Sequence, residues 1–246
     1  MNLLENLGSY LILMRQVITL PPRVYIFRRQ LFTEIQNLGF DSMGIVAIIS
    51  IFMGAVVTIQ TAYNIDSPLI PLTMIGFTAR QSVILEFAPT IISLILAGKV
   101  GSRIASEIGT MRVTQQIDAL EVMGINSANY LILPKILASM IFNPVLIVLS
   151  ISLSLFGGWM VAILTSLYTP HDYISGLRIN FDGFTVFYAL IKTVVFAYII
   201  ASVSGYQGYR ISGGALEVGQ ASTRAVVHSS INIIVFNLIL TQLLLT

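Results

Sequence analysis

The 246-residue sequence contains no cysteine, so neither a disulfide nor a thiolate metal site can form. It has only two histidines, and we therefore expect no metal site. Charged residues make up 10% of the chain, whereas soluble domains carry about 25%. A chain with 56% hydrophobic residues cannot cover itself with an ordinary wet surface, so most of its surface must face lipid or protein. The net charge of +2 gives no reason to expect a nucleic-acid partner.

The sequence also lacks a complete ATP-binding loop. Gly214 and Gly219 have the glycine spacing of such a loop, but Gln220 occupies the lysine position and Ala221 the Ser/Thr position. Without the lysine, the loop lacks the main cation that holds the phosphates. We therefore expect no cofactor in this chain. If ATP drives this protein, another chain binds ATP and Mg²⁺ and hydrolyses the nucleotide.

Residues 1–41 form an N-terminal region of two amphipathic segments separated by Pro21-Pro22. We do not expect it to be a secretory signal, because Glu5 lies where a basic region would be and no small-residue cleavage site follows an apolar core. Amphipathic segments with basic residues ahead of a first span are typical of helices in the membrane interface, and a packed cytosolic hairpin is the alternative. The residues at helical spacing are Leu3, Leu4, Leu7, Leu11, Met14 and Ile18, then Val24, Phe27, Leu31, Ile35 and Leu38, with Arg23, Arg28 and Arg29 nearby.

Residues 42–246 are predicted to form one compact membrane domain. Crossing the bilayer core needs about 20 apolar residues, and five stretches qualify. The third is too long for one perpendicular crossing, so we expect Pro134 and Pro144 to bend it or to separate a lead-in segment. The predicted spans are 43–65, 82–102, one within 131–167, 184–206 and 225–245. The sequence thus predicts an all-α integral membrane protein with about five transmembrane helices.

Lysine and arginine are distributed unevenly between the two sides of these spans. Residues 1–41 and the connections after the second and fourth spans carry most of them, whereas the opposite side has only Arg80 and Arg178. Because loops rich in lysine and arginine stay in the cytosol, we expect a cytosolic N-terminus and a C-terminus, Thr246, on the outer side.

The end of the second span carries a stripe of small residues four apart, Ala97, Gly101, Ala105 and Gly109. Such a stripe allows helix backbones to approach closely in membranes. Lys99, Arg103 and Glu107 form a neighbouring stripe at the same spacing, so the helix is predicted to leave the bilayer here. The small-residue stripe suits packing within the chain and contact with a second copy equally well.

A short helix of its own is predicted over residues 112–123. Its apolar residues Val113, Ile117 and Leu120 share one face, and Gly124 is placed to cap its C-terminus. A helix this short is marginal alone, so other surfaces must hold it. We expect the apolar face to dock on the membrane domain and the charged side to meet a partner; a solvated loop helix is the alternative. The residues expected to face the partner are Arg112, Gln115, Asp118 and Glu121.

Two charges lie inside apolar spans, Glu86 and Lys192. Charges at membrane depth are expensive and usually face a cavity or a partner. We expect both to line or flank a cavity open to lipid, with Lys192 the stronger candidate because its neighbours on both sides are apolar. Each could instead be an interfacial residue that extends toward water.

These motifs resemble those of the MlaE/YrbE-type permeases of ABC transporters that work with MCE-domain proteins. The resemblance covers most of the chain after residue 40. It implies a homodimeric permease in a bacterial inner membrane, joined to ATPase subunits, with an MCE-domain protein on the outer side and phospholipid as cargo. It also makes 112–123 the coupling helix. Gln115-Gln116 depart from the glutamate common in the family here. The motifs are EFAP at 86–89, AGKVGSRIASEIGTMRVTQQIDALEVMGI at 97–125, LPKILA at 133–138, LIKTVVFA at 190–197 and STRAVVHSS at 222–230.

Two other classes of function compete with this one. A stand-alone channel or secondary transporter would be expected to show more charges within the spans and an internal repeat, and neither is visible. A membrane-embedded enzyme would need a cluster of acid, base and nucleophile. The run His228-Ser229-Ser230 is too weak a signal for one.

Overall fold

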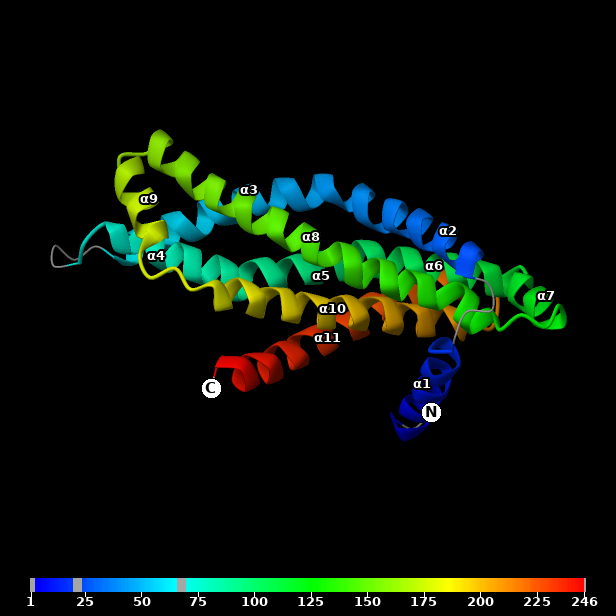
Figure 1. Cartoon of the computed structure of the whole chain (residues 1–246). Coiled ribbons are helices and arrows are strands. Elements are labelled where there is room, and N and C mark those ends of the chain that lie inside the picture. Colours follow the sequence, from blue (N-terminus) through cyan, green and yellow to red (C-terminus); the bar gives the residue numbers. More distant parts are fainter. Residues whose placement is uncertain (1–2, 20–23, 66–69, 246) are drawn as a thin grey trace.

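The computed structural model describes residues 3–19, 24–65 and 70–245, and all regular structure within these ranges is helical (Figure 1). The predicted all-α class is confirmed. The α-helices are α1 (Leu3–Val17), α2 (Val24–Glu34), α3 (Asp41–Asn64), α4 (Thr73–Ser82), α5 (Ile92–Leu96), α6 (Ser102–Val113), α7 (Gln116–Val122), α8 (Ser127–Leu164), α9 (Pro170–Arg178), α10 (Gly183–Tyr209) and α11 (Ala215–Leu245). The π-helical segments are η1 (Ile35–Phe40), η2 (Val83–Ile91) and η3 (Ala97–Gly101).

Five helical stretches of the described chain are long and apolar enough to cross a membrane, as the sequence predicts. The second of them joins α4, η2, α5, η3 and α6 end to end. At 1.5 Å per residue, the 38 residues of α8 extend about 57 Å, well beyond a bilayer core of about 30 Å. The stretches are Tyr25–Asn64, Thr73–Val113, Ser127–Leu164, Gly183–Tyr209 and Ala215–Leu244.

The helical stretch Tyr25–Asn64 is continuous across the boundary predicted between residues 41 and 42, so the second interfacial segment and the first span share one helix. Helix α8 also runs through Pro134 and Pro144, and no lead-in segment is separated from this span. Prolines are tolerated inside membrane helices because neighbouring groups can satisfy the freed backbone carbonyls.

Helix α1 projects from the end of the bundle that carries α7 (Figure 1). It packs through Leu13, Met14 and Val17, which are buried. Much of the predicted apolar face is not covered by the rest of the chain, since Leu11 and Ile18 are each about two-thirds exposed. An apolar face without protein cover suits a helix lying in the membrane interface. Outside the described residues lie Pro21, Pro22 and Arg23, with the side chains of Leu3, Leu4, Asn6 and Val24.

Polar contacts fix where α1 meets the bundle. The Tyr10 hydroxyl donates to Ser202 Oγ at 2.8 Å, and its ring packs edge-on against Tyr206. The Asn129 amide donates to the carbonyls of Val17 and Thr19. Burial raises the pKa of Tyr10 to about 12, so this hydroxyl stays protonated and remains a donor at neutral pH.

Helices α3 and α8 pack in the same direction through a seam of small residues. Ser50 Oγ donates to Ser150 Oγ at 2.7 Å, and Gly54 lies directly against the backbone of Ser154. One turn further along, Thr58 of α3 meets Gly158 of α8. Small residues four apart on both helices let the backbones approach closely, as in other membrane helix pairs.

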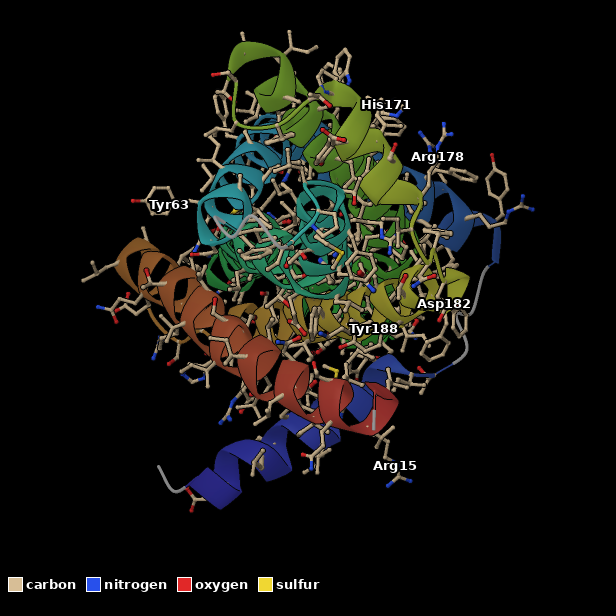
Figure 2. The ribbon with its side chains drawn as sticks, turned by 90° about the vertical axis from the view of Figure 1, so that its left-hand side faces the viewer. Arg15, Tyr63, His171, Arg178, Asp182 and Tyr188 are labelled. Atoms are coloured by element: carbon tan, nitrogen blue, oxygen red, sulfur yellow. The ribbon has the colours of Figure 1, made fainter. Side chains whose placement is uncertain are left out.

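At the opposite end of the bundle, α4 packs against α9, and Figure 2 looks onto this end. The Arg80 guanidinium is buried and donates to the carbonyls of Leu177 and Asn180, at 2.6 and 3.3 Å. It also faces the rings of Phe77 and Phe181. Arg80 is therefore not a free loop charge, and it satisfies carbonyls at the C-terminal end of α9.

Helix α11 lies on one side of the bundle, packed against α10 and α6 (Figure 1). Its outer face is apolar and exposed over most of its length. The exposed residues include Leu216, Val227, Ile231, Ile234, Val235, Leu238 and Leu243. A face of this kind requires lipid or another apolar surface as its cover.

Candidate functional site

The two charges predicted inside the spans form an ion pair. Lys192 Nζ of α10 lies 2.8 Å from Glu86 Oε1 of η2, although 106 residues separate them in the chain. The Lys192 side chain is completely buried, whereas that of Glu86 is 42% exposed. Lys192 Nζ also donates to the Leu85 carbonyl at 3.3 Å and lies over the Tyr188 ring. The pair thus has one enclosed member and one open member.

Helix α11 completes this site with two polar residues one turn apart. The Asn237 amide donates to Glu86 Oε2 at 3.0 Å, and the Thr241 hydroxyl lies 3.2 Å from Glu86 Oε1 and 3.0 Å from Lys192 Nζ. Thr90 adds a contact of 3.2 Å to Glu86 Oε2. These hydrogen bonds join η2, α10 and α11 at one point within the predicted membrane region.

Asn237, Thr241 and Thr90 were missed in the sequence analysis, although a signal was present. Asn237 and Thr241 stand four apart in the otherwise apolar run FNLILT, so they share one helix face. An asparagine inside a span is rare enough to suggest a polar partner on a neighbouring helix.

Glu86 lies in a π-helical segment that also contains Pro89. Proline lacks a backbone N–H and cannot continue the regular hydrogen-bond ladder. A π-helical turn admits an additional residue per turn, and such turns are frequent at functional sites. The motif EFAP thus contains both the Glu86 carboxylate and the proline that accompanies the π-helical backbone around it.

The structure places Lys192 away from any open surface of the chain, at 0% exposure. Of the two residues predicted to line a lipid cavity, only Glu86 reaches the surface directly. Any effect of Lys192 on a ligand would act through Glu86 and Thr241, which it contacts. The assignment of both residues to a lipid cavity stays a prediction.

The small-residue stripe packs within the chain. A Cβ added at Gly101 would lie 2.8 Å from Ser204 Oγ of α10, and one added at Gly109 would overlap the Ile211 side chain. The stripe therefore faces α10 and the connection to α11. This is packing within the chain, the first of the two uses that the sequence allowed. Its members Ala97, Gly101, Ala105 and Gly109 are all buried.

The charged stripe beside it binds other helices. Arg103 pairs with Asp41 at the start of α3 at 2.8 Å, and Lys99 Nζ donates to the Asp41 carbonyl. Glu107 pairs with Lys135 of α8 at 2.9 Å. The last turns of the second span are thus anchored to α3 and α8.

The predicted 112–123 helix is divided in two. Arg112 belongs to the last turn of α6, which ends at Val113, and α7 covers only Gln116–Val122. Gln115 between them has a left-handed backbone, φ 59°, which ends the first helix and starts the second. The sequence gives no sign of this break, because the apolar residues keep their helical spacing across it.

The C-terminus of α7 closes as predicted at Gly124. This glycine has φ +75°, and its N–H donates to the Glu121 carbonyl at 2.9 Å. The Ile125 N–H donates to the Leu120 carbonyl at 3.0 Å, which completes a Schellman motif. A seven-residue helix is thereby held in a defined orientation.

All three of the charges predicted to face a partner, Arg112, Asp118 and Glu121, are already used inside the chain. Arg112 pairs with Asp118 at 2.7 Å across the α6–α7 break. Glu121 accepts hydrogen bonds from Ser127 and Tyr209, both at 2.9 Å. These contacts fix α7 against α8 and α10.

The exposed tip of α7 is apolar. Ile117 is completely buried beneath the helix, whereas Val122 is 89% exposed and Met123 is 64% exposed. Two adjacent apolar side chains in water at the end of a rigid helix offer a small docking surface. Val122 and Met123 were not among the residues predicted to face a partner, which were all polar or charged.

A bundle with five helices long and apolar enough to cross a membrane, an ion pair between two of its segments and a fixed helix beyond its end are the features of a multi-pass membrane protein. The chain matches the family described as Permease MlaE over residues 31–243, and it belongs to this family.

Named relatives agree with this family. A probable ABC transporter permease protein of Rickettsia bellii is 34% identical, covering 98% of this chain and 93% of that protein. The intermembrane phospholipid transport system permease protein MlaE of Haemophilus influenzae is 28% identical, covering 87% of this chain and 82% of the relative. The chloroplastic protein TRIGALACTOSYLDIACYLGLYCEROL 1 of Arabidopsis thaliana is also 28% identical, covering 87% and 61%.

Proposed function

We propose that this chain is the permease subunit of an ABC transporter that moves phospholipid between the inner and outer membranes of a bacterium. In this proposal it works as a homodimer in the inner membrane, with a separate ATPase on one side and an MCE-domain protein on the other. The phospholipid cargo is supported by the name of the Haemophilus relative, which belongs to an intermembrane phospholipid transport system.

The observation that carries the proposal is the rigid α7 helix with its exposed apolar tip. A separate ATPase needs a contact that transmits movement, and a flexible loop would absorb such movement. The Schellman cap, the Arg112–Asp118 pair and the Glu121 hydrogen bonds make α7 rigid. Val122 and Met123 then supply the surface that an ATPase groove can cover.

Replacing Val122 and Met123 together with aspartate should release the ATPase without unfolding the permease. Both side chains are mostly exposed, so the change removes little packing within the chain, but it places two charges in an apolar contact. We expect at least a tenfold loss of co-purified ATPase and of ATP hydrolysis stimulated by the permease. Val122→Ala with Met123→Leu is the control and should retain both. Normal co-purification of the aspartate variant would contradict the role of this tip.

The structure changes which substitutions test this contact. Reversing the charges of Asp118 and Glu121 would also break the Arg112 pair and the bonds from Tyr209 and Ser127. A loss of activity in that variant would therefore mix two causes, movement of α7 and repulsion of a partner. The exposed tip avoids this ambiguity.

A second copy of the chain is proposed to cover the apolar face of α11. Ile231, Ile234 and Leu238 are each more than half exposed on this face. Glu86 opens to the surface beside Asn237 of the same helix, so a dimer formed here would enclose the carboxylates of both copies. Such an enclosed space between two apolar faces suits the acyl chains and headgroup of a phospholipid.

The proposed orientation has its own test, because the chain contains no cysteine. An odd number of crossings puts the two ends of the spanning bundle on opposite sides. A cysteine added after Thr246, which lies outside the described residues, should react with a membrane-impermeant thiol reagent on spheroplasts. A cysteine at Asn2 should react only after the membrane is permeabilised. The reverse pattern would overturn the orientation inferred from lysine and arginine.

A further inference from the structure

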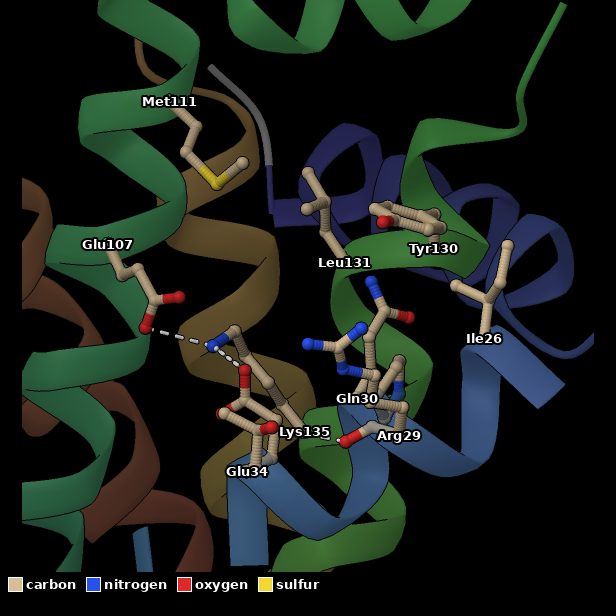
Figure 3. Close-up of a pocket in the computed structure, with 11 residues that line it drawn as sticks. Ile26, Arg29, Gln30, Glu34, Glu107, Met111, Tyr130, Leu131 and Lys135 are labelled. Atoms are coloured by element: carbon tan, nitrogen blue, oxygen red, sulfur yellow. Dashed lines mark hydrogen bonds and ion pairs between the residues drawn. The ribbon is translucent and has the colours of Figure 1, made fainter. Parts of the chain in front are cut away.

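A cavity of about 470 Å³ lies between α2, α6 and α8 at the α7 end of the bundle, far from the Glu86–Lys192 pair (Figure 3). Its size falls within the range of about 300–1,000 Å³ that small-ligand sites occupy. One wall is apolar, and the opposite side carries charged and amide groups. The lining residues are Ile26, Arg29, Gln30, Thr33, Glu34, Glu107, Met111, Tyr130, Leu131, Pro134 and Lys135.

An ion cluster forms the charged side of this cavity. The Lys135 ammonium lies 2.7 Å from Glu34 Oε1 of α2 and 2.9 Å from Glu107 Oε2 of α6, and its side chain is 2% exposed (Figure 3). The second oxygen of the Glu34 carboxylate, Oε2, is buried and accepts no hydrogen bond from any described residue. A buried carboxylate oxygen without a hydrogen bond is energetically costly, so a ligand that donates a hydrogen bond to it would be stabilised.

A free cation stands at the mouth of the same cavity. Arg29 lines it from α2, is exposed, and forms no ion pair with a carboxylate of the described chain. The formal charges of the four groups sum to zero, since Arg29 and Lys135 are cations and Glu34 and Glu107 are anions. A ligand with one negative and one positive group would leave that balance intact.

We propose that this cavity binds the headgroup of a phospholipid that carries a primary amine, phosphatidylethanolamine, from the leaflet at the α7 end. The Arg29 guanidinium binds the phosphate, for which its planar fork of donors is well suited. The ammonium donates hydrogen bonds to the carboxylates of Glu34 and Glu107. The apolar wall of Ile26, Met111 and Leu131 contacts the glycerol and the first acyl carbons.

The chemistry of the amine separates this lipid from its common relatives. A choline headgroup carries three methyl groups on nitrogen and has no N–H to give to Glu34. A glycerol headgroup leaves the phosphate charge unbalanced beside two carboxylates. This site is separate from a cargo path at Glu86. Its lining residues Glu107 and Met111 belong to α6, the helix that immediately precedes α7.

Photocrosslinking at two neighbouring positions of α2 tests the proposal in the otherwise unchanged full chain. p-Benzoylphenylalanine at Ile26 lines the cavity mouth, whereas the same residue at Tyr25, which is 80% exposed and outside the cavity, samples the bulk bilayer. The protein is placed in nanodiscs with equal parts of phosphatidylethanolamine, phosphatidylcholine and phosphatidylglycerol. Adducts are then quantified by mass spectrometry of the α2 peptide.

We expect position 26 to capture phosphatidylethanolamine at least fivefold above its share of the bilayer, and position 25 to capture the three lipids in equal parts. Arg29→Ala and Glu34→Gln should each abolish the enrichment. Arg28→Ala removes an exposed arginine that does not line the cavity and should leave it unchanged. Equal capture at position 26, or enrichment of either other lipid there, would overturn the proposal without a variant being needed. Equal effects of Arg28→Ala and Arg29→Ala would also overturn it.

Discussion

Gly54→Ala should prevent stable folding of this permease. A Cβ at position 54 would overlap the backbone of Ser154, so α3 and α8 would have to move apart along their seam. Backbone atoms cannot rotate away as a flexible side chain can, and we expect the loss to be about 3 kcal/mol or more, at the upper end for overpacking. Fluorescence-detected size exclusion and a thermal melt of the detergent-solubilised protein measure the effect.

Gly44→Ala is a matched control for this substitution. It adds the same methyl group to the same helix, but nothing lies within 4 Å of the new Cβ. Alanine favours a helix over glycine by about 1 kcal/mol, so this variant should melt at the same temperature or slightly higher. Equal behaviour of the two variants would mean that the α3–α8 seam does not have the close approach described here.

Removing Glu86 should destabilise the protein far more than removing Lys192. Glu86→Leu leaves a fully buried ammonium without its carboxylate, which costs about 3 kcal/mol, the lower end of the usual range because Leu85 and Thr241 still accept from it. Lys192→Met leaves a carboxylate that is 42% exposed and still bound by Asn237, so the loss should be small. Thermal unfolding in detergent compares the two variants.

The double variant Glu86→Leu with Lys192→Met gives the decisive comparison. It removes both charges from an apolar region, and we expect it to recover most of the stability lost in Glu86→Leu. If the proposed lipid cavity lies beside this pair, Lys192→Met and the double variant should both transport less lipid although they are folded. Normal transport by the folded double variant would show that the pair is structural only.

Much of the chain could be predicted because its signals are local. Apolar runs of bilayer length indicated all five spans. A span can be identified from one segment alone, from its apolar residues and from the lysine and arginine residues that flank it. The end of α7 was predictable for the same reason, because Gly124 is the residue that a left-handed cap favours. The break at Gln115 was not, because a non-glycine residue with positive φ has no reliable sequence signal.

Only the tertiary structure decided which of these local features meet. The sequence marked Glu86 and Lys192 as expensive charges, but their pairing joins residues 106 positions apart and depends on how α10 packs against η2. The small-residue stripe faces α10, and the serines and glycines of α3 meet those of α8 along the seam between the two helices. A stripe of small residues fixes the distance at which a helix can be approached, whereas the partner is chosen by the packing of the whole bundle. The sequence by itself therefore determined the spans and the charges within them, and the arrangement of helices determined their contacts.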